Sequence, residues 1–539
     1  MRDRLRRRER SVVLGGLLVL SLAGALGAQA PAPAETKETY GQRARAQVET
    51  NLRQRPNKRR AKNVILFVGD GMGVTTITAA RILAGQLTTP NQGGEENLLS
   101  FERFPYLAHS KTYQVNQQVA DSAPTMTALI TGYKARDGML SVDPFKVLRN
   151  DDFALAARPE SHLQSLLEKA ESRGLWTGVV STARVTHATP AACYAHTSHR
   201  DAESAADLAR LAQKTGKDPG GLRDIAAQLL DFRVRPTTLN GKPSPGLEVV
   251  LGGGRSKFML DSQTDPEDST RKGEQPARDL VKEWTDRGGV YVTNRQEFAS
   301  LQPGTTGPVL GLFESSYMQY ELERAGKAVP DEPSLAEMTT TAIRILERGP
   351  KGFFLMVEAG RIDHGLHGGN AKRALYDTIA LAKAVDAATA LVGNDTLIVV
   401  TADHSHTLTM SGYPKRGNPI LGLVIGNDEV GEPETEPALA LDGKPYTTLG
   451  FANGPGSNCI CKRDEKGQMA CDCPPRADLS AVDTTADDFR QQALVPGGSE
   501  THGGEDVAIY ARGPWAHLVQ GTMEENAVYW VMAKALGWW

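Results

Sequence analysis

The hydrophobic residues of this chain are concentrated in four short continuous runs. These are NVILFVGD at 63–70, TGVVST at 177–182, GFFLMVEAG at 352–360 and DTLIVVTADH at 395–404. A continuous apolar run with polar flanks predicts a strand that is buried on both faces, as strands of a parallel sheet are.

Longer segments with helical periodicity lie between and beside these runs, at 71–85, 161–173, 334–348 and 371–392. Strands that alternate with helices predict an α/β fold with a mainly parallel, doubly wound sheet and helices on both faces. Residues 260–310 and 410–500 are poorer in periodic elements and rich in Pro, Gly and acidic groups. We interpret them as insertions, the second forming a cap or crown.

The N-terminus has the pattern of an export signal. Six arginines within the first ten residues precede a short, glycine-interrupted apolar run and then small residues. This predicts a cleaved signal peptide at 1–30 and an exported, periplasmic or extracellular protein, with Sec and twin-arginine export both open. A retained anchor is the alternative, although the run is short for a stable membrane span. Polar residues 31–61 predict an arm or linker, and 62–539 one folded domain.

Composition and charge narrow the class of protein. The 539 residues are 40% hydrophobic and 23% charged, as in ordinary globular proteins. A formal net charge of −3 gives no electrostatic reason to expect nucleic acid as a partner.

The cysteines predict a crosslinked hairpin. Cys459, Cys461, Cys471 and Cys473 form two C-x-C pairs around a polar stretch. In an oxidising compartment this predicts two bridges, and pairing 459 with 473 and 461 with 471 is the least strained of three connectivities. A small zinc site is the alternative. Cys193 is predicted to be a buried thiol.

Candidate metal ligands stand at the ends of three predicted strands. One run ends at Asp70, one reaches Glu358, and one ends at Asp403 and His404. Ligand sites of open α/β sheets gather at the carboxyl ends of the strands. A single Asp there would be explained as a helix cap. Three such strand ends, one of which also carries a His, favour a cluster of metal ions, because bound cations offset the free-energy cost of burying the carboxylates.

Two further segments extend the ligand set. In EAGRIDHGLHGG, Asp363 and His367 are four residues apart and would point the same way on a helical turn. Carboxylate with imidazole suits Zn²⁺, although a solvated polar loop is the alternative. His502 in ETHGGEDVAIYARG would supply a third ligand, since catalytic zinc commonly has three and keeps one position open.

The candidate nucleophile is Ser122, in ADSAPTMTALITG ahead of an apolar-periodic helix. An N-cap serine is the plainer interpretation, but a helix N-terminus also favours a phosphoryl group. Because no G-x-S-x-G elbow is present, activation of the hydroxyl by metal is the consistent choice. In the segment 181–201, Arg200 suits phosphate oxygens and Thr189 suits Mg²⁺.

Six motifs in order resemble the alkaline phosphatase family. They are VGDGMG, DSAPT, THATPA, VEAGRIDHG, TADHSH and ETHGGEDVA, spread between Lys62 and His517. LGGGR, GLFE, GYPKRG and NGPG look more like animal members than like short bacterial ones. The resemblance implies hydrolysis of small phosphate monoesters at alkaline pH through a phosphoserine, and a homodimer.

The resemblance also implies two Zn²⁺ and one Mg²⁺ per subunit. The first zinc would be held by Asp363, His367 and His502, and the second by Asp70, Ser122, Asp403 and His404. Magnesium would be held by Asp70, Thr189 and Glu358. Arg200 would clamp the phosphate, His187 would lie beside the magnesium where other members have Asp, and His406 would orient a ligand.

Animal-type members carry a calcium site as well. The matching positions are Glu267, the carbonyl of Phe313, Glu314 and Glu332, the last standing where the family usually has Asp. Oxygen ligands of this kind suit Ca²⁺.

Three other functions compete with this interpretation. A sulfatase would need a modifiable C/S-x-P-x-R context, which DSAPT does not offer, and a phosphodiesterase would need room for a second ester group. A non-catalytic metal- or phosphate-binding protein would bind zinc without turnover.

Overall fold

The computed structural model describes residues 36–88, 93–232, 246–301, 304–305, 307–328, 331–463 and 468–539, so the predicted signal peptide lies outside the described residues. The chain divides into two units, 1–54 and 55–539. In the first unit, part of the predicted arm is helix α1 (Lys37–Arg53), capped by Thr36, which accepts a hydrogen bond from the Thr39 amide. Every helix within the described ranges is too short or too polar to span a bilayer.

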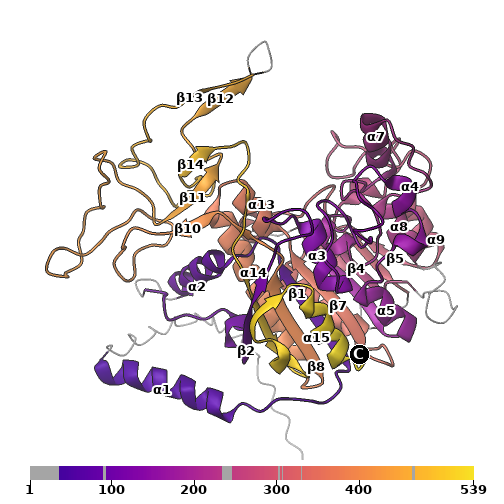
Figure 1. Cartoon of the computed structure of the whole chain (residues 1–539), viewed down its shortest axis with the longest axis horizontal. Coiled ribbons are helices and arrows are strands. Elements are labelled where there is room, and N and C mark those ends of the chain that lie inside the picture. The colour runs from indigo at the N-terminus through magenta and orange to yellow at the C-terminus, as the bar shows by residue number, and fades with distance from the viewer. Residues whose placement is uncertain are drawn as a thin grey trace, which may run out of the picture. The chain divides into compact units, whose positions relative to one another are not determined.

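The second unit is built on one ten-stranded sheet, in the order β17-β2-β16-β8-β1-β7-β3-β4-β6-β5 (Figure 1). The strands are β1 (Asn63–Gly69), β2 (Tyr106–Lys111), β3 (Trp176–Arg184), β4 (Val249–Gly253), β5 (Val290–Val292), β6 (Val309–Leu312), β7 (Phe353–Ala359), β8 (Thr396–Ala402), β16 (Val507–Arg512) and β17 (Gly521–Glu524). From β8 to β5 all pairs are parallel, and β16 is antiparallel to both neighbours. The four predicted strands are the adjacent central strands β8, β1, β7 and β3.

The central strands are apolar throughout because both faces of the sheet are covered. In β1, Val64 and Leu66 point into one hydrophobic core, whereas Ile65 and Phe67 point into the other. Helices α3 and α15 line the first core, and α2, α12 and α14 line the second (Figure 1). The predicted doubly wound α/β fold is therefore confirmed.

The helices of this unit in the described residues are α2 (Val74–Thr88), α3 (Ser122–Thr131), α4 (Phe153–Ala156), α5 (Leu166–Arg173), α6 (Ala188–Ala191), α7 (Ala205–Thr215), α8 (Ile225–Asp231), α9 (Leu280–Asp286), α10 (Arg295–Ala299), α11 (Glu321–Gly326), α12 (Leu335–Leu346), α13 (Arg361–His367), α14 (Ala371–Leu391) and α15 (Ala527–Ala535). The segments predicted at 71–85, 161–173, 334–348 and 371–392 correspond to α2, α5, α12 and α14, although α5 begins at Leu166 rather than at 161. Capping boxes at Ser165 and Ser334 set the starts of α5 and α12.

The predicted end of the first helix at Gly85 is wrong. Helix α2 continues to Thr88. The glycine serves close packing instead, since a Cβ at position 85 would lie 2.6 Å from the Cα of Gly94.

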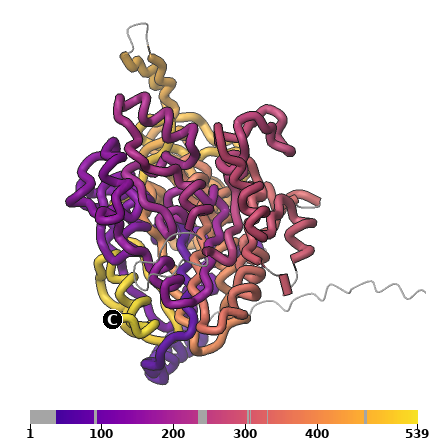
Figure 2. Tube along the Cα trace, turned by 90° about the vertical axis from the view of Figure 1, so that its right-hand side faces the viewer, coloured from indigo at the N-terminus to yellow at the C-terminus, as the bar shows by residue number. Residues whose placement is uncertain are grey.

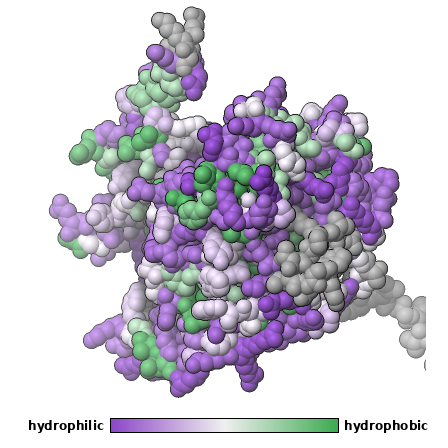
Figure 3. All heavy atoms as spheres, turned by 45° about the vertical axis from the view of Figure 1, so that its right-hand side comes forward, coloured by the Kyte–Doolittle hydropathy of each residue, from purple (hydrophilic) through white to green (hydrophobic). Residues whose placement is uncertain are grey.

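The interpretation of 260–310 as an insertion is wrong in part, because β5 and the start of β6 extend the main sheet at its edge. The segment 410–500 forms a separate three-stranded sheet of β10 (Leu408–Met410), β11 (Leu449–Gly454) and β14 (Ala493–Pro496). A hairpin of β12 (Ile460–Arg463) and β13 (Met469–Asp472) projects from this region (Figures 1 and 2). The space-filling view shows it as a narrow projection (Figure 3).

Two disulfides, Cys459–Cys473 and Cys461–Cys471, crosslink the hairpin. This is the pairing that was predicted as the least strained. The alternative of a zinc site at these cysteines is therefore wrong. Cys193 is a buried free thiol.

Buried Asp377 on α14 makes the stability of the fold depend on pH. Its carboxylate accepts the Glu321 amide at 3.1 Å. Burial raises its pKa to about 8, although Arg361 acts in the opposite direction. The folded state therefore binds a proton more tightly than the unfolded state, so the stability that this group provides at low pH is lost as pH rises from about 4 through 8.

We predict that Asp377→Asn, which keeps the acceptor but removes the charge, stabilises the protein by an amount that grows between pH 5 and pH 8. The gain should reach the order of a few kcal/mol, since each pKa unit corresponds to about 1.4 kcal/mol. Calorimetric Tm values at pH 5, 7 and 9 measure this. Asp386→Asn, an exposed site on the same helix, is the control, and a gain independent of pH would contradict the prediction.

Candidate metal centre and active site

Three predicted carboxylates meet at one edge of the sheet. Strand β1 pairs in register with β7 and β8, so that Gly69 lies opposite both Ala359 and Ala402. Asp70 and Asp403 directly follow their strands, Glu358 is the penultimate residue of β7, and all three are fully buried. The sheet therefore places three acidic side chains together at its carboxyl end, as predicted.

The first group of candidate ligands consists of Asp363, His367 and His502. Asp363 and His367 lie on α13, and His502 lies in β15 (His502–Gly503), which pairs with β9 (Ser405–His406). The Nε2 atoms of the two histidines are 3.1 Å apart, and Asp363 Oδ1 is 3.4 Å and 3.5 Å from them. Ligands about 2.0–2.1 Å from a tetrahedral zinc are separated by about 3.3 Å. These three atoms therefore fit one zinc ion.

The backbone fixes the orientation of both imidazoles. His367 Nδ1 donates to the Glu500 carbonyl and His502 Nδ1 donates to the Ala120 carbonyl, each at 2.6 Å. In the neutral imidazole, each Nε2 then carries a lone pair that faces the gap.

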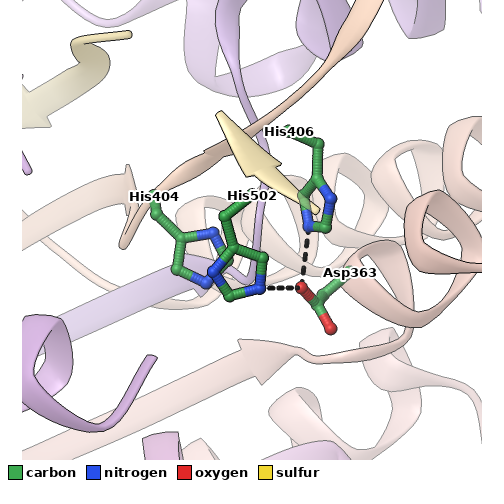
Figure 4. Close-up of side chains that lie close together, drawn as sticks. All are labelled: Asp363, His404, His406 and His502. Atoms are coloured by element: carbon green, nitrogen blue, oxygen red, sulfur yellow. Dashed lines mark hydrogen bonds and ion pairs between the residues drawn. The ribbon is translucent and has the colours of Figure 1, made fainter. Parts of the chain in front are cut away.

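Both ring nitrogens of His406 contact carboxylates. Its Nε2 is 2.7 Å from Asp363 Oδ1 (Figure 4). Its Nδ1 contacts the Glu500 carboxylate. Burial lowers its pKa, but the hydrogen bonds to Asp363 and Glu500 outweigh burial and raise it to about 9. His406 also lies within reach of a metal ion shared with Asp363, His404 and His502, and its role in orienting Asp363 stays a prediction.

The second group surrounds Ser122 Oγ. This atom is 3.1 Å from His404 Nε2 and 3.3 Å from Asp70 Oδ1. His404 Nε2 in turn lies 3.4 Å from Asp70 Oδ1 and 3.5 Å from Asp403 Oδ2. The rings of His404 and His502 stack with centroids 3.7 Å apart, so the two groups adjoin (Figure 4).

The third group is marked by buried oxygens. Within the described residues, Asp70 Oδ2, Glu358 Oε1 and Thr189 Oγ1 are buried without a well-formed hydrogen bond. Oxygens of this kind are costly to bury alone, and a hard cation such as Mg²⁺ prefers them as ligands. Asp70 presents one oxygen to the second group and the other to the third, and can therefore bridge them.

The electrostatics of the centre favour bound cations. Burial and the neighbouring Asp403 raise the pKa of Asp70, and burial raises the pKa of Asp403 and brings that of Glu358 to about 7. Burial also lowers the pKa of His404, which keeps its imidazole neutral and able to bind metal.

Ser122 is the first residue of α3 rather than its cap. The N-cap is Asp121, whose carboxylate accepts the Ala123 amide at 3.2 Å. The cap interpretation of Ser122 is therefore wrong, and its hydroxyl is available at the positive end of the helix. Arg200 contacts the Asp121 carboxylate, and its Nη2 is 2.8 Å from His187 Nε2.

Several residues of the site were not predicted from the sequence. Thr125 Oγ1 lies 3.3 Å from Asp403 Oδ2, and Ser181 donates to Glu358. Asp121 and Glu500 complete the set. Their signal in the sequence was weak because Ser, Thr and acidic residues next to a motif are common.

The predicted calcium ligands are placed as follows. Glu332 is buried, and burial together with nearby Glu314 raises its pKa to about 9. Glu267 forms an ion pair with Arg255 at 2.6 Å, and Phe313 is buried. The calcium site stays a prediction.

Comparison with known proteins identifies the class. Residues 61–538 match the family model described as alkaline phosphatase. The tissue-nonspecific alkaline phosphatase of Gallus gallus is 42% identical over 510 residues, covering 92% of this chain and 89% of the relative. The human tissue-nonspecific isozyme is 40% identical over 493 residues, covering 89% of this chain and 85% of the relative.

Solved structures agree on the fold. The alkaline phosphatase of Thermus thermophilus has a TM-score of 0.60 at 22% identity, covering 90% of this chain and 94% of that one. That of the Antarctic bacterium TAB5 has a TM-score of 0.55 at 20% identity, covering 89% and 99%. A variant of the TAB5 enzyme was solved with Mg bound in its M3 site.

This chain belongs to the alkaline phosphatase family. It is accordingly an enzyme of the phosphoric monoester hydrolase class, and the resemblance drawn from the motifs is confirmed.

We predict that removing divalent cations destabilises the protein. A chelator leaves the buried carboxylates to repel one another, and a ligand at about a thousand times its Kd stabilises by about 4 kcal/mol. Calorimetry of EDTA-dialysed protein should therefore show Tm rising by several degrees with Zn²⁺ and again with Mg²⁺. In Thr189→Val the Mg²⁺ increment should shrink while the Zn²⁺ increment stays, and equal loss of both would contradict the assignment of Thr189.

Proposed function

We propose that this enzyme converts phosphate monoesters into an alcohol and inorganic phosphate at alkaline pH through a phosphoserine at Ser122. The observation that carries the proposal is the position of Ser122 Oγ within 3.1–3.3 Å of His404 Nε2 and Asp70 Oδ1 at the N-terminus of α3. An alkaline optimum follows because the serine alkoxide becomes more available as pH rises.

The residues present fit two Zn²⁺ and one Mg²⁺. The first zinc would be held by Asp363, His367 and His502, the second by Asp70, Asp403 and His404 beside Ser122, and the magnesium by Asp70, Thr189 and Glu358. When bound, these cations supply the positive charge that favours deprotonation of serine and water and steadies the leaving oxygen.

The chain itself positions the reacting groups. Ser122 Oγ is aimed for in-line attack on phosphorus, while the amides at the start of α3 and the Arg200 guanidinium hold the non-bridging oxygens. Asp121 and His187 fix the guanidinium from two sides. The ester oxygen leaves opposite Ser122, and water enters from the same side to hydrolyse the phosphoserine.

We further propose that the protein is exported to the periplasm or outside the cell after loss of residues 1–30, and that it works as a homodimer on small substrates. Residues 31–61 would form an arm, and the 410–500 region a crown within the catalytic domain 62–539. The two disulfides support export, since such bonds persist in oxidising compartments.

Replacing the nucleophile tests the central step. Ser122→Ala should abolish the acid-stable phosphoenzyme and lower kcat/KM for a chromogenic aryl phosphate by at least about 10³-fold, because the reaction loses its covalent route. Ser110→Ala, which removes another buried serine hydroxyl, is the matched control. Phosphoenzyme in the Ser122→Ala protein would exclude Ser122 as the nucleophile.

Replacing Arg200 tests phosphate recognition. Arg200→Ala should raise KM and the inhibition constant of inorganic phosphate by roughly 10–100-fold with a smaller change in kcat, since a bidentate charged contact contributes a few kcal/mol. The ratio of kcat/KM for an aryl phosphate to kcat/KM for its diester should fall, because Arg200 favours a doubly charged terminal phosphate. An unchanged ratio would argue against this role.

A further inference from the structure

Glu500 is a buried acid beside the proposed first zinc site that binds no metal in the scheme above. It lies two residues before His502 and is 1% exposed. One carboxylate oxygen accepts both the amide and the hydroxyl of Thr407, each at 2.6 Å, and the other contacts His406 Nδ1. Both carboxylate oxygens of Glu500 therefore contact His406 in β9 or Thr407, the residue after it.

His406 transmits this contact to a candidate ligand. The imidazole lies between two carboxylates, with Glu500 at Nδ1 and Asp363 Oδ1 at 2.7 Å from Nε2. Asp363 Oδ1 is also the atom that faces the Nε2 atoms of His367 and His502. The chain Glu500–His406–Asp363 thus ends on an atom of the first group of ligands.

The main chain of Glu500 acts on a second ligand. Its amide donates to the His367 carbonyl at 2.9 Å, and its carbonyl accepts from His367 Nδ1 at 2.6 Å. These two bonds clamp His367 so that Nε2 faces the gap. Glu500 therefore contacts His367 directly and reaches Asp363 through His406. It also precedes the third candidate ligand, His502, by two residues.

The end of β11 holds Glu500 in this place. Gly454 adopts a φ of 129°, and a Cβ there would lie 2.9 Å from the Glu500 Cβ. The Thr501 amide donates to Asn453 Oδ1 at 2.9 Å. Close packing of this kind leaves the Glu500 backbone little freedom to move away from α13.

We propose that Glu500 is a positioning residue for the first zinc site: its carboxylate orients Asp363 through His406, and its backbone orients His367. This inference rests on the proposed function. Groups that hold metal ligands in place typically contribute 10–100-fold to metal affinity.

The test measures zinc affinity rather than turnover. Metal-free wild-type, Glu500→Ala and Glu500→Gln proteins are titrated with Zn²⁺ against a chelator of known affinity, and bound zinc is counted. Glu500→Ala should weaken one zinc per chain by 10–100-fold. Glu500→Gln, which keeps the size and one acceptor oxygen, should weaken it less. Glu171→Ala is the matched control, since Glu171 on α5 is a buried acid that accepts the hydroxyl of Thr177 in β3. The zinc affinity of this variant should stay within twofold of wild type.

A double-mutant cycle separates positioning from general destabilisation. If Glu500 acts through His406, Glu500→Ala should cost less than twofold in zinc affinity when introduced into a His406→Ala protein. Metal-free Tm values of Glu500→Ala and Glu171→Ala report the structural cost alone.

Three results would overturn the inference. These are an affinity of Glu500→Ala within twofold of wild type, an equal zinc loss in Glu171→Ala, and an undiminished effect of Glu500→Ala in the His406→Ala background. Wild-type protein that binds no zinc would overturn the proposed function as well, so the two failures are distinguishable.

Discussion

Mutual repulsion among buried carboxylates is the constraint on which this structure depends. Asp70, Glu358 and Asp403 lie at one end of the sheet without solvent, and burial raises their pKa values. Such a cluster is tolerable when it is protonated or when cations occupy it. The cations proposed for catalysis would therefore also help to hold the folded core together.

The geometry of the centre follows from strand register and hydrogen bonding. Pairing of β1 with β7 and β8 places Asp70 level with Asp403 and two residues beyond Glu358 along the sheet. The orientations of His367 and His502 are then set by bonds from Nδ1 to backbone carbonyls, which leave each Nε2 facing the proposed first zinc site. The proposed nucleophile, Ser122, gains its position from α3, because Asp121 takes the capping role.

The central sheet and the position of the acidic cluster could be predicted from the sequence, because exposed apolar runs and buried acidic residues are both energetically costly unless the fold accommodates them. Continuous apolar runs identified the four central strands, and acidic residues at their ends located the site. Weaker signals failed for physical reasons. Gly85 looked like a helix end but is required by the approach of Gly94, and the short edge strand β5 carries too few apolar residues to stand out. Glu500 was missed because its partners lie 93 to 133 residues away in sequence.

The candidate ligands are drawn from positions 70 to 502, and this spread has a consequence for biogenesis. A nascent chain that ends before His502 lacks one of the three atoms that fit the first zinc ion, and it also lacks β16, which borders β8 in the sheet. The proposed first zinc site can therefore be completed only after the C-terminal segment has been synthesised. Until then the acidic cluster of the nascent chain would have to stay hydrated.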